Sequence, residues 1–350
     1  MLRSHAFSKE LLTRPFSVHG IVNSLLSSNL PPQNPITHQQ PAAPSTEHRL
    51  QCFRRPYHMV SRCQAFVGER TESAQEYHSA DFDFHEHKAA VDEQLANDPS
   101  AYQIPEGSGP RKQPILSEHE AWEAFHARDN ATARFYKERR YLLLEFPVLT
   151  VQDPPQRIAE LGCGCGSALL PILKENQQST VIATDISPTA VRLLEAAAAR
   201  AGIASHRIQA FACDSANPAV GDCMLSGAEA DSLLIIFTLA ALPQEDQHHM
   251  LSNAFKALKA GGRLLIRDHG IYDITQLRLR PEQKISENLY KRGDSTLCYF
   301  FSTEDLEAKA AAAGFTTEEC SYVCVQLLNR KKGFLIRRVF VHGIFRKPEH

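Results

Sequence analysis

Long apolar runs are missing from this sequence of 350 residues. The longest, Leu233–Leu242, is shorter than the ~18 residues that a membrane-spanning helix requires, so we expect no membrane segment. Cysteine pairs with the spacing of zinc ligands are missing as well. The nine cysteines are scattered and contain no C-x-x-C motif, which indicates reduced thiols in an intracellular compartment and no metal site.

Acidic residues are scarce at the N-terminus. Residues 1–66 contain seven Lys or Arg but only two acids, together with many Ser, Pro and Gln. This composition is typical of an organellar transit peptide, so we expect a disordered targeting segment for the mitochondrion or the plastid. The alternative is a disordered tail without an address, which would leave the protein in the cytoplasm.

The charge of the remaining chain is divided unevenly. The formal net charge is only −2, but residues 67–260 hold sixteen Lys or Arg against 27 Asp or Glu. Residues 261–350 reverse the balance, with fifteen bases and eleven acids. A basic C-terminal third allows a nearly neutral protein to bind a polyanion there.

After residue 156, short apolar runs alternate with helix-like runs, which predicts an α/β fold with a parallel sheet. Residues 67–155 precede this pattern as an extension that becomes helical near 117–147, where Ser117 and Glu120 have the spacing of a capping box. The segments expected are strands at 157–161, 180–184, 207–212, 231–237, 262–267, 316–327 and 334–346, and helices at 166–177, 188–200, 244–259 and 302–313.

The first expected strand leads into the loop ELGCGCG at residues 160–166. A glycine-rich loop at this place is where an open α/β sheet binds a nucleotide. Alternating glycines, here Gly162 and Gly164, let the backbone turn sharply and approach the ligand. The spacing differs from the G-x-G-x-x-G of dinucleotide folds, and C-x-C is not the C-x-x-C of redox proteins, so we interpret Cys163 and Cys165 as small loop residues.

Two further acids end the next expected strands. Asp185 can accept hydrogen bonds from both ribose hydroxyls of an adenosyl group, and Asp214 can reach the adenine amino group. Together with Glu160 they surround a nucleoside without a cluster of phosphate-binding cations. S-adenosylmethionine is a nucleoside without phosphates, so this pattern favours a methyltransferase over a nicotinamide dehydrogenase.

From about Trp122 to Pro348, the sequence resembles the eukaryotic methyltransferase-like enzymes that form 3-methylcytidine in tRNA. The most specific block lies between Gly261 and Phe301, which general methyltransferases lack. The resemblance implies a Rossmann-like class I fold: a seven-stranded, mostly parallel sheet with an antiparallel last strand and helices on both faces. It also implies a substrate, the cytidine at position 32 of the anticodon loop. The blocks that carry it are WEAFHARDNATARFYKERRYLLLEFPVL, ELGCGCGSALLPIL, IIFTLAAL, GGRLLIRDHGIYDITQLRLR, ENLYKRGDSTLCYFFSTEDL and NRKKGFLIRRVFVHGIFRKP.

The resemblance further implies how the chain is organised. The extension at 67–155 would serve as a cofactor lid and in RNA recognition, and the domain at 156–350 would carry a basic insertion at 270–300. This sequence departs from the family at three positions, where His126 replaces Tyr, Ser215 replaces Leu and His269 replaces Tyr. The loop pattern predicts Gly164 as a cofactor contact. The resemblance implies further cofactor contacts at Trp122, His126, Gly162, Asp185, Asp214, Ser215 and Ile236.

Methylation at N3 makes few demands on catalytic side chains. That ring nitrogen carries a lone pair and no proton in neutral cytosine, so catalysis rests on positioning the reactants and excluding water. The product is a cationic base, which a nearby carboxylate would stabilise. Asp268, at the end of the fifth expected strand, is our candidate for that role; a structural turn or an ion pair with Arg267 is the alternative.

Three basic clusters are candidates for contacts with RNA phosphates. We expect tRNA as the partner, with an aminoacyl-tRNA synthetase or another accessory protein as a further partner. The alternatives are a methyltransferase for a small molecule or a protein, and an RNA-binding protein without a cofactor. The clusters are Arg134, Lys137, Arg139 and Arg140; Arg278, Arg280, Lys284, Lys291 and Arg292; and Arg330, Lys331, Lys332, Arg337 and Arg338.

Overall fold

The computed structural model describes residues 77–103, 116–129, 137–219, 227–329 and 334–349. The chain divides into two units, Met1–Glu69 and Arg70–His350, and the described residues all belong to the second. The expected targeting segment at 1–66 therefore lies outside them. No helix in the described ranges is long and apolar enough to cross a membrane.

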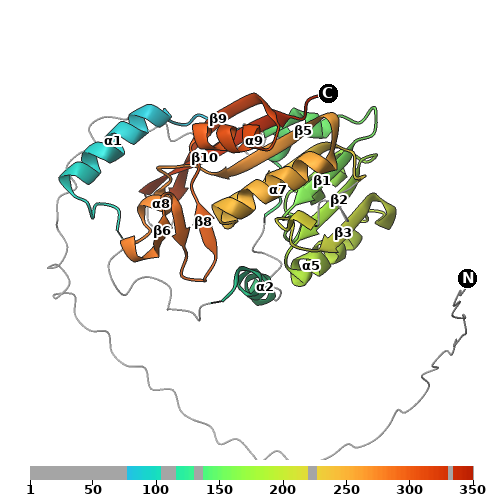
Figure 1. Cartoon of the computed structure of the whole chain (residues 1–350), viewed down its shortest axis with the longest axis horizontal. Helices are drawn as coiled ribbons and strands as arrows, with labels where there is room; N and C mark the ends of the chain where they lie inside the picture. The colour runs from blue at the N-terminus through green and yellow to red at the C-terminus, as the bar shows by residue number, and fades with distance from the viewer. Residues whose placement is uncertain (1–76, 104–115, 130–136, 220–226, 330–333, 350) are drawn as a thin grey trace, which may run out of the picture. The chain divides into compact units, whose positions relative to one another are not determined.

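A central sheet organises the described residues (Figure 1). Its strand order is β3-β2-β1-β4-β5-β10-β9, with β10 antiparallel to both of its neighbours and the first five strands parallel. The seven-stranded, mostly parallel sheet with an antiparallel last strand is thereby confirmed. Its strands are β1 (Arg157–Leu161), β2 (Thr180–Asp185), β3 (Ile208–Ala212), β4 (Ala230–Ile236), β5 (Leu258–His269), β9 (Thr316–Asn329) and β10 (Phe334–Arg346).

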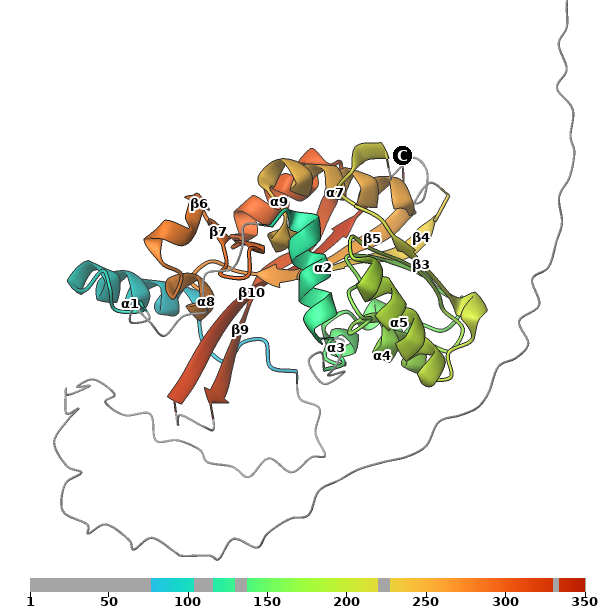
Figure 2. The ribbon, with the colours of Figure 1, turned by 90° about the horizontal axis from the view of Figure 1, so that it is seen from below.

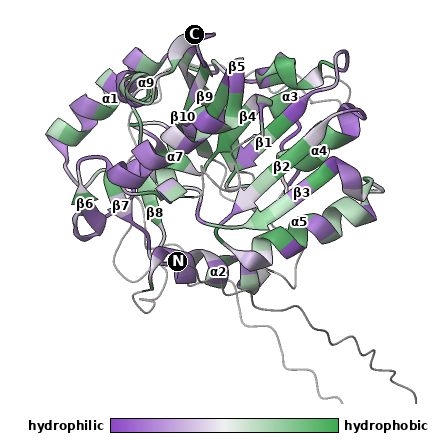
Figure 3. Cartoon of the chain, turned by 45° about the vertical axis from the view of Figure 1, so that its right-hand side comes forward, coloured by the Kyte–Doolittle hydropathy of each residue, from purple (hydrophilic) through white to green (hydrophobic). Residues whose placement is uncertain are grey.

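The sheet separates two hydrophobic cores, because side chains alternate between its faces. In β4, Leu233 and Ile235 belong to one core, and Leu234 and Ile236 belong to the other. Helices α7 and α9 cover the first core, and α3 (Leu142–Glu145), α4 and α5 cover the second, so helices lie on both faces as predicted. Both α5 and α7 carry hydrophilic as well as hydrophobic residues (Figure 3). These elements are α4 (Leu169–Glu175), α5 (Pro188–Arg200), α7 (Gln244–Ala257) and α9 (Thr303–Ala312), with short 3-10 turns η2 (Ser205–Arg207) and η3 (Leu239–Ala241).

The segment between β5 and α9 contains the basic insertion expected at 270–300, and it has regular secondary structure. It folds into a small antiparallel sheet, in the order β6-β7-β8, whose Leu289, Leu297 and Tyr299 join the first core. Helix α1 (Phe84–Asn97) also forms, ahead of the helical region that we expected near 117–147, and Phe84 stacks on Tyr322 of β9. The inserted elements are α8 (Ile274–Leu277), η4 (Pro281–Gln283), β6 (Lys284–Ser286), β7 (Leu289–Lys291) and β8 (Leu297–Tyr299).

The extension before β1 contains α2 (Glu118–Asp129), α3 (Leu142–Glu145) and η1 (Pro147–Thr150). The capping box at the start of α2 is confirmed: the Glu120 amide donates to Ser117 Oγ at 3.3 Å, and the Ser117 amide donates to the Glu120 carboxylate at 2.9 Å. Helix α2 lies beside α5 (Figure 2). It therefore stands over the carboxyl ends of the first strands, where a nucleotide site is expected.

Candidate active site

A cavity of about 650 Å³ lies at the carboxyl ends of the parallel strands. Its lining comes from the loops after β1 to β4, from the end of β5, from α2, from β10 and from the turn after β7. All of the residues expected to contact the cofactor line it: Trp122, His126, Gly162, Gly164, Asp185, Asp214, Ser215 and Ile236. The fold thus brings together side chains that are spread over more than a hundred positions in the sequence.

The glycine loop needs its glycines for both conformation and space. Gly162 and Gly164 have φ values of +74° and +52°, in the left-handed region that favours glycine. A Cβ on Gly162 would lie 2.2 Å from Thr238 Cγ2, closer than real atoms approach. The amides of Gly162 and Cys163 both donate to the carbonyl of Thr184, which holds the loop against β2.

Asp185 is buried at the end of β2 and shapes the loop next to it. One carboxylate oxygen accepts the Gly164 amide at 2.8 Å, and the other accepts the Ser187 amide at 2.9 Å. Burial raises the pKa of Asp185, while these two amides and His126 act in the opposite direction. Each oxygen keeps a lone pair for another donor, so a ribose diol can still bind here.

Glu160 provides a test of whether the site fits a cationic cofactor. Its side chain is buried in the cavity wall, and Oε2 has no hydrogen-bond partner within the described residues. Burial raises the pKa of this carboxyl well above its ordinary value, although the Arg139 charge opposes the shift. An acceptor left unpaired in a wall calls for a donor from a ligand. The ammonium group of S-adenosylmethionine is such a donor, so these residues fit that cofactor.

The adenosine side of the cavity is shaped by the loop after β3. Asp214 is exposed, and its Oδ1 accepts the Ala216 amide at 2.9 Å. Ser215 is buried, with its Oγ 2.6 Å from Thr184 Oγ1, so its hydroxyl is engaged with the protein. Glu118 of α2 also lines the cavity, and burial together with Asp246 and Asp214 raises its pKa. Glu118 was absent from our predictions because nothing in its local sequence shows that α2 folds over Asp214.

Helix α2 brings Trp122 and His126 to the cavity, as their four-residue spacing on one face predicts. Their ring centroids lie 6.2 Å apart, and His126 is buried. Glu123, also outside our predictions, ties the helix to the start of α5. Its carboxylate accepts from Ser187 Oγ at 2.5 Å, from the Thr189 amide at 3.2 Å and from Thr189 Oγ1.

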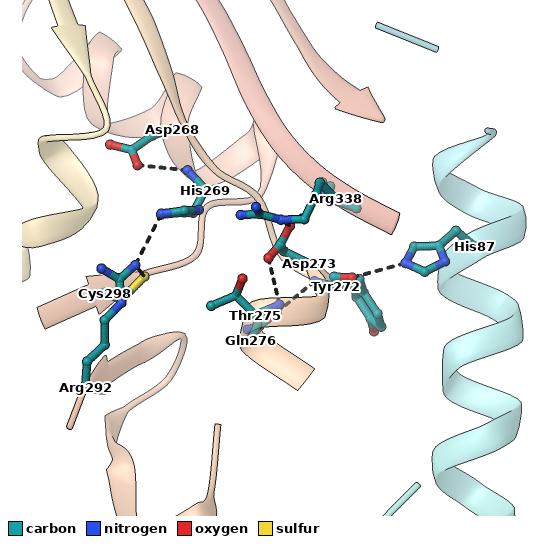
Figure 4. Close-up of polar contacts among 11 residues, drawn as sticks. His87, Asp268, His269, Tyr272, Asp273, Thr275, Gln276, Arg292, Cys298 and Arg338 are labelled. Carbon is teal, nitrogen blue, oxygen red and sulfur yellow. Dashed lines mark hydrogen bonds and ion pairs between the residues drawn. The ribbon is translucent and has the colours of Figure 1, made fainter. Parts of the chain in front are cut away.

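Arginines gather at the other end of the cavity, around His269 at the end of β5. Arg267 pairs with the buried carboxylate of Glu145 at 2.6 Å, and Arg338 pairs with Asp273 at 2.7 Å. Arg292 approaches His269 Nε2 at 3.3 Å and donates to Cys298 Sγ at 2.8 Å (Figure 4). Arg139 lies between the two ends, with Nε donating to Ser167 Oγ, just after the glycine loop, and its guanidinium over the Phe237 ring.

Asp268 supports the site from behind rather than lining it. Its carboxylate is fully buried and accepts the Ala240 amide at 2.9 Å and the His269 amide at 2.8 Å. Burial raises its pKa to about 7. It makes no ion pair with Arg267, whose partner is Glu145. In this position Asp268 fixes the backbone that carries His269, and the catalytic role that we expected for it stays a prediction.

The residues expected to bind RNA divide into three groups. Arg139, Arg292 and Arg338 line the cavity. A second group lies on the protein outside the cavity lining and includes exposed Lys137, Arg140 and Arg337. The second group also contains Arg278, Arg280, Lys284 and Lys291. The third group lies outside the described residues and consists of Arg134, Arg330, Lys331 and Lys332.

Comparison with known proteins agrees with this geometry. A family model described as "Methyltransferase domain" matches residues 159–264. Among solved structures, a SAM-dependent methyltransferase from Anabaena variabilis superposes with a TM-score of 0.51 at 15% identity, covering 67% of this chain and 97% of that chain. This likeness confirms the Rossmann-like methyltransferase fold.

Three curated relatives are similar over more than half of the chain. O-methyltransferase 3 of Dictyostelium discoideum is 38% identical over 55% of this chain, and the yeast tRNA(Thr) (cytosine(32)-N(3))-methyltransferase is 34% identical over 65%. The matches span 44% and 37% of those two proteins, less than half of either. The rat tRNA N(3)-cytidine methyltransferase METTL6 is 32% identical over 65% of this chain and 78% of its own length. The chain therefore belongs to the family of tRNA N(3)-cytidine methyltransferases.

Proposed function

We propose that this chain methylates N3 of a cytidine in tRNA, with S-adenosylmethionine as the methyl donor, and that the target is position 32 of the anticodon loop. The family supports the reaction, and the name of the yeast relative supports the position. The same proposal extends to particular tRNA species as substrates and to an accessory protein, such as an aminoacyl-tRNA synthetase, as a partner. An organellar location remains a proposal that rests on the composition of residues 1–66.

The observation that carries the proposal is the division of charge along the cavity. Its acidic end, defined by Glu118, Glu160, Asp185 and Asp214, suits a cofactor with a sulfonium and an ammonium group. Its basic end is lined by Arg267, Arg292 and Arg338; Glu145 and Asp273 neutralise the first and the third, so Arg292 is the one of the three whose charge is left for an anionic substrate. RNA carries a phosphate at every nucleotide, whereas a neutral small molecule would gain little from these arginines.

The residues at the basic end also fit a nucleobase that has left its stack. Phe237 and Phe340 line the cavity with their rings 5.5 Å apart, and both lie near His269. Arg139 lies over the Phe237 ring, and Arg267 and Arg338 lie over the Phe340 ring. Aromatic rings and guanidinium planes both stack on unpaired bases in proteins that recognise single-stranded RNA. An anticodon loop is already single-stranded, so extruding one of its bases costs at most a few kcal/mol.

The chemistry requires no strong base in the cavity. Bound S-adenosylmethionine supplies a methyl group activated by the sulfonium, and N3 of cytosine supplies the lone pair. Burial, followed by the charges of Arg292, Arg338 and Arg139, holds the pKa of His269 well below its ordinary value. Its Nε2 faces the Arg292 guanidinium at 3.3 Å, so that nitrogen is not placed to take a proton from a substrate. The described residues thus position and desolvate the reactants, which is what attack by a neutral nitrogen needs.

The Dictyostelium relative supports a second candidate, because its name describes an O-methyltransferase. A hydroxyl must lose its proton when it is methylated, so that activity would need a base beside the methyl group. Its substrate would be a hydroxyl group instead of the N3 atom of cytosine. The two candidates therefore differ in both substrate and catalytic requirement.

Nucleoside mass spectrometry separates them. Total tRNA lacking the modification is incubated with the purified protein and S-adenosylmethionine, beside an Asp185→Ala variant. We expect new 3-methylcytidine with the wild type, and at least a tenfold loss with the variant because a buried ribose acceptor is removed. No methylated nucleoside from a protein that binds the cofactor in calorimetry, also after addition of a cell extract that supplies accessory proteins, would contradict the RNA proposal. Methylation of a small hydroxyl compound would support the second candidate.

A further inference from the structure

Arg292 is held at the basic end of the cavity by the turn that follows β7. The Arg292 amide donates to the Thr296 carbonyl at 2.8 Å, and the Ser295 amide donates back to the Arg292 carbonyl at 3.0 Å. Asp294, in the same turn, accepts from the Thr296 amide and hydroxyl at 3.1 and 2.7 Å. The backbone that carries Arg292 is therefore fixed before any ligand binds.

The Arg292 side chain contacts only neutral groups among the described residues. Nη2 approaches His269 Nε2 at 3.3 Å and lies 2.8 Å from Cys298 Sγ (Figure 4). His269 is neutral in this environment, so its Nε2 carries a lone pair that accepts from the guanidinium. Burial raises the pKa of Cys298 to about 12, so this partner is a thiol rather than a thiolate.

The other two arginines of the basic end are already neutralised. Arg267 has Glu145 at 2.6 Å, and Arg338 has Asp273 at 2.7 Å. Arg292 forms no ion pair with a carboxylate within 4.0 Å in the described ranges. Its side chain lines the cavity, so a positive charge that no carboxylate bonds directly faces the cavity, and it acts only through space on the buried Asp268. Arg292 is half-buried, so its guanidinium remains open to an anionic ligand in the cavity.

We propose that the Arg292 guanidinium binds an RNA phosphate next to the target cytidine, and that His269 is the positioning residue that holds it there. This inference rests on the proposed function. A phosphate fits better than the base itself, because a guanidinium pairs with phosphate oxygens through two parallel hydrogen bonds. The methylated base is cationic and would be repelled by Arg292, whereas an intervening phosphate neutralises that charge.

A double-mutant cycle between protein and RNA tests the contact. Wild type and Arg292→Gln are titrated with a fluorescent anticodon stem-loop in which one phosphate beside the target cytidine is either native or an uncharged methylphosphonate. The linkage on each side of the cytidine is replaced in turn. With one of them, we expect each single change to weaken binding about tenfold and the double change to weaken it little further. Arg278→Gln, which lies outside the cavity, is the matched control and should combine additively with either methylphosphonate.

Variants of His269 test the positioning role. Gln can place an acceptor near the position of Nε2, whereas Phe cannot. We expect His269→Phe to abolish the coupling between Arg292 and the phosphate, and His269→Gln to keep part of it. Both variants and Arg292→Gln should bind S-adenosylhomocysteine within about threefold of wild type, because neither residue is at the acidic end.

The outcomes separate this inference from the proposed function. Wild-type binding with strictly additive effects of Arg292→Gln and both methylphosphonates would overturn the phosphate contact and leave the proposed function standing. Coupling that persists in His269→Phe would overturn the positioning role alone. A wild type that binds the cofactor analogue but no RNA would overturn the proposed function and this inference together.

Discussion

Replacing Glu123 by Ala should weaken cofactor binding although Glu123 does not line the cavity. Trp122 and His126, its neighbours on α2, do line it. Glu123 fastens that helix to the first turn of α5 by accepting from Ser187 and Thr189. Burial acts to raise the pKa of Glu123, but the hydrogen bonds from these two residues outweigh it and hold the pKa below its ordinary value.

The size of the effect follows from these contacts. A hydrogen bond to a charged group contributes about 1.5–3 kcal/mol when it is well buried. Glu123 is partly exposed and solvent screens its charge, so we assign the three bonds together only about 1–2 kcal/mol. Since Trp122 and His126 belong to the docked helix, the loss should raise the dissociation constant of the cofactor about 5–30-fold.

The assay uses a property of the sequence, because Trp122 is the only tryptophan. Its fluorescence is followed while S-adenosylhomocysteine is added to wild type, Glu123→Ala and Glu120→Ala. Glu120 is on the same helix but serves the capping box, so its replacement should change the dissociation constant less. Equal effects of the two substitutions, or an unchanged constant in Glu123→Ala, would refute docking through this carboxylate.

Three further predictions concern stability. Gly162→Ala should lower the melting temperature more than Gly202→Ala. Both positions have φ above +70°, but of the two only Gly162 would bring the new Cβ within 4 Å of another atom. Equal shifts in melting temperature would show that backbone conformation alone matters. Burial raises the pKa of Asp268 to about 7, above its value in the unfolded chain, so the stability from its protonated form is complete at low pH and lost as pH rises through 7. The unfolding free energy of Asp268→Asn should therefore fall less between pH 5 and pH 8 than that of wild type. Urea titrations in which both proteins lose the same unfolding free energy over this range would contradict the prediction. Glu145→Ala should lower the free energy of unfolding by about 3–5 kcal/mol, because Arg267 keeps a buried charge without its partner, and a denaturation midpoint near that of wild type would argue against the pair.

Much of this fold was predictable because its signals are local. A central parallel strand such as β4 is buried on both faces, so its sequence is a nearly continuous apolar run. Ser187 caps α5 and accepts the Ala190 amide, with Pro188 at the first helical position, which is a pattern of adjacent residues. Gly162 and Asp185 were found for the same reason, since each stands at the end of a recognisable strand in a known order.

The inserted sheet and helix α1 were harder to predict. Strands β6, β7 and β8 have three residues each, too few to show a period of two against their many basic neighbours. They are stable because Leu289 and Leu297 reach the core built by α7 and α9, a contact between distant segments. Helix α1 likewise depends on Phe84 packing against β9, which its own sequence does not reveal.

The sequence by itself determined the order of strands and helices, the glycine loop and the acids that follow the strands, because short-range sterics and side-chain periodicity fix these features. Only the tertiary structure decided which charges are compensated. Arg267, Arg292 and Arg338 all line the cavity and look alike as basic residues, yet two of them meet buried carboxylates from remote elements and Arg292 pairs with no carboxylate of the described residues. The tertiary structure also decided that the Asp268 carboxylate lies behind the cavity wall, where it accepts two backbone amides. A side chain at a strand end can point to either face of the sheet, and the packing around it selects one.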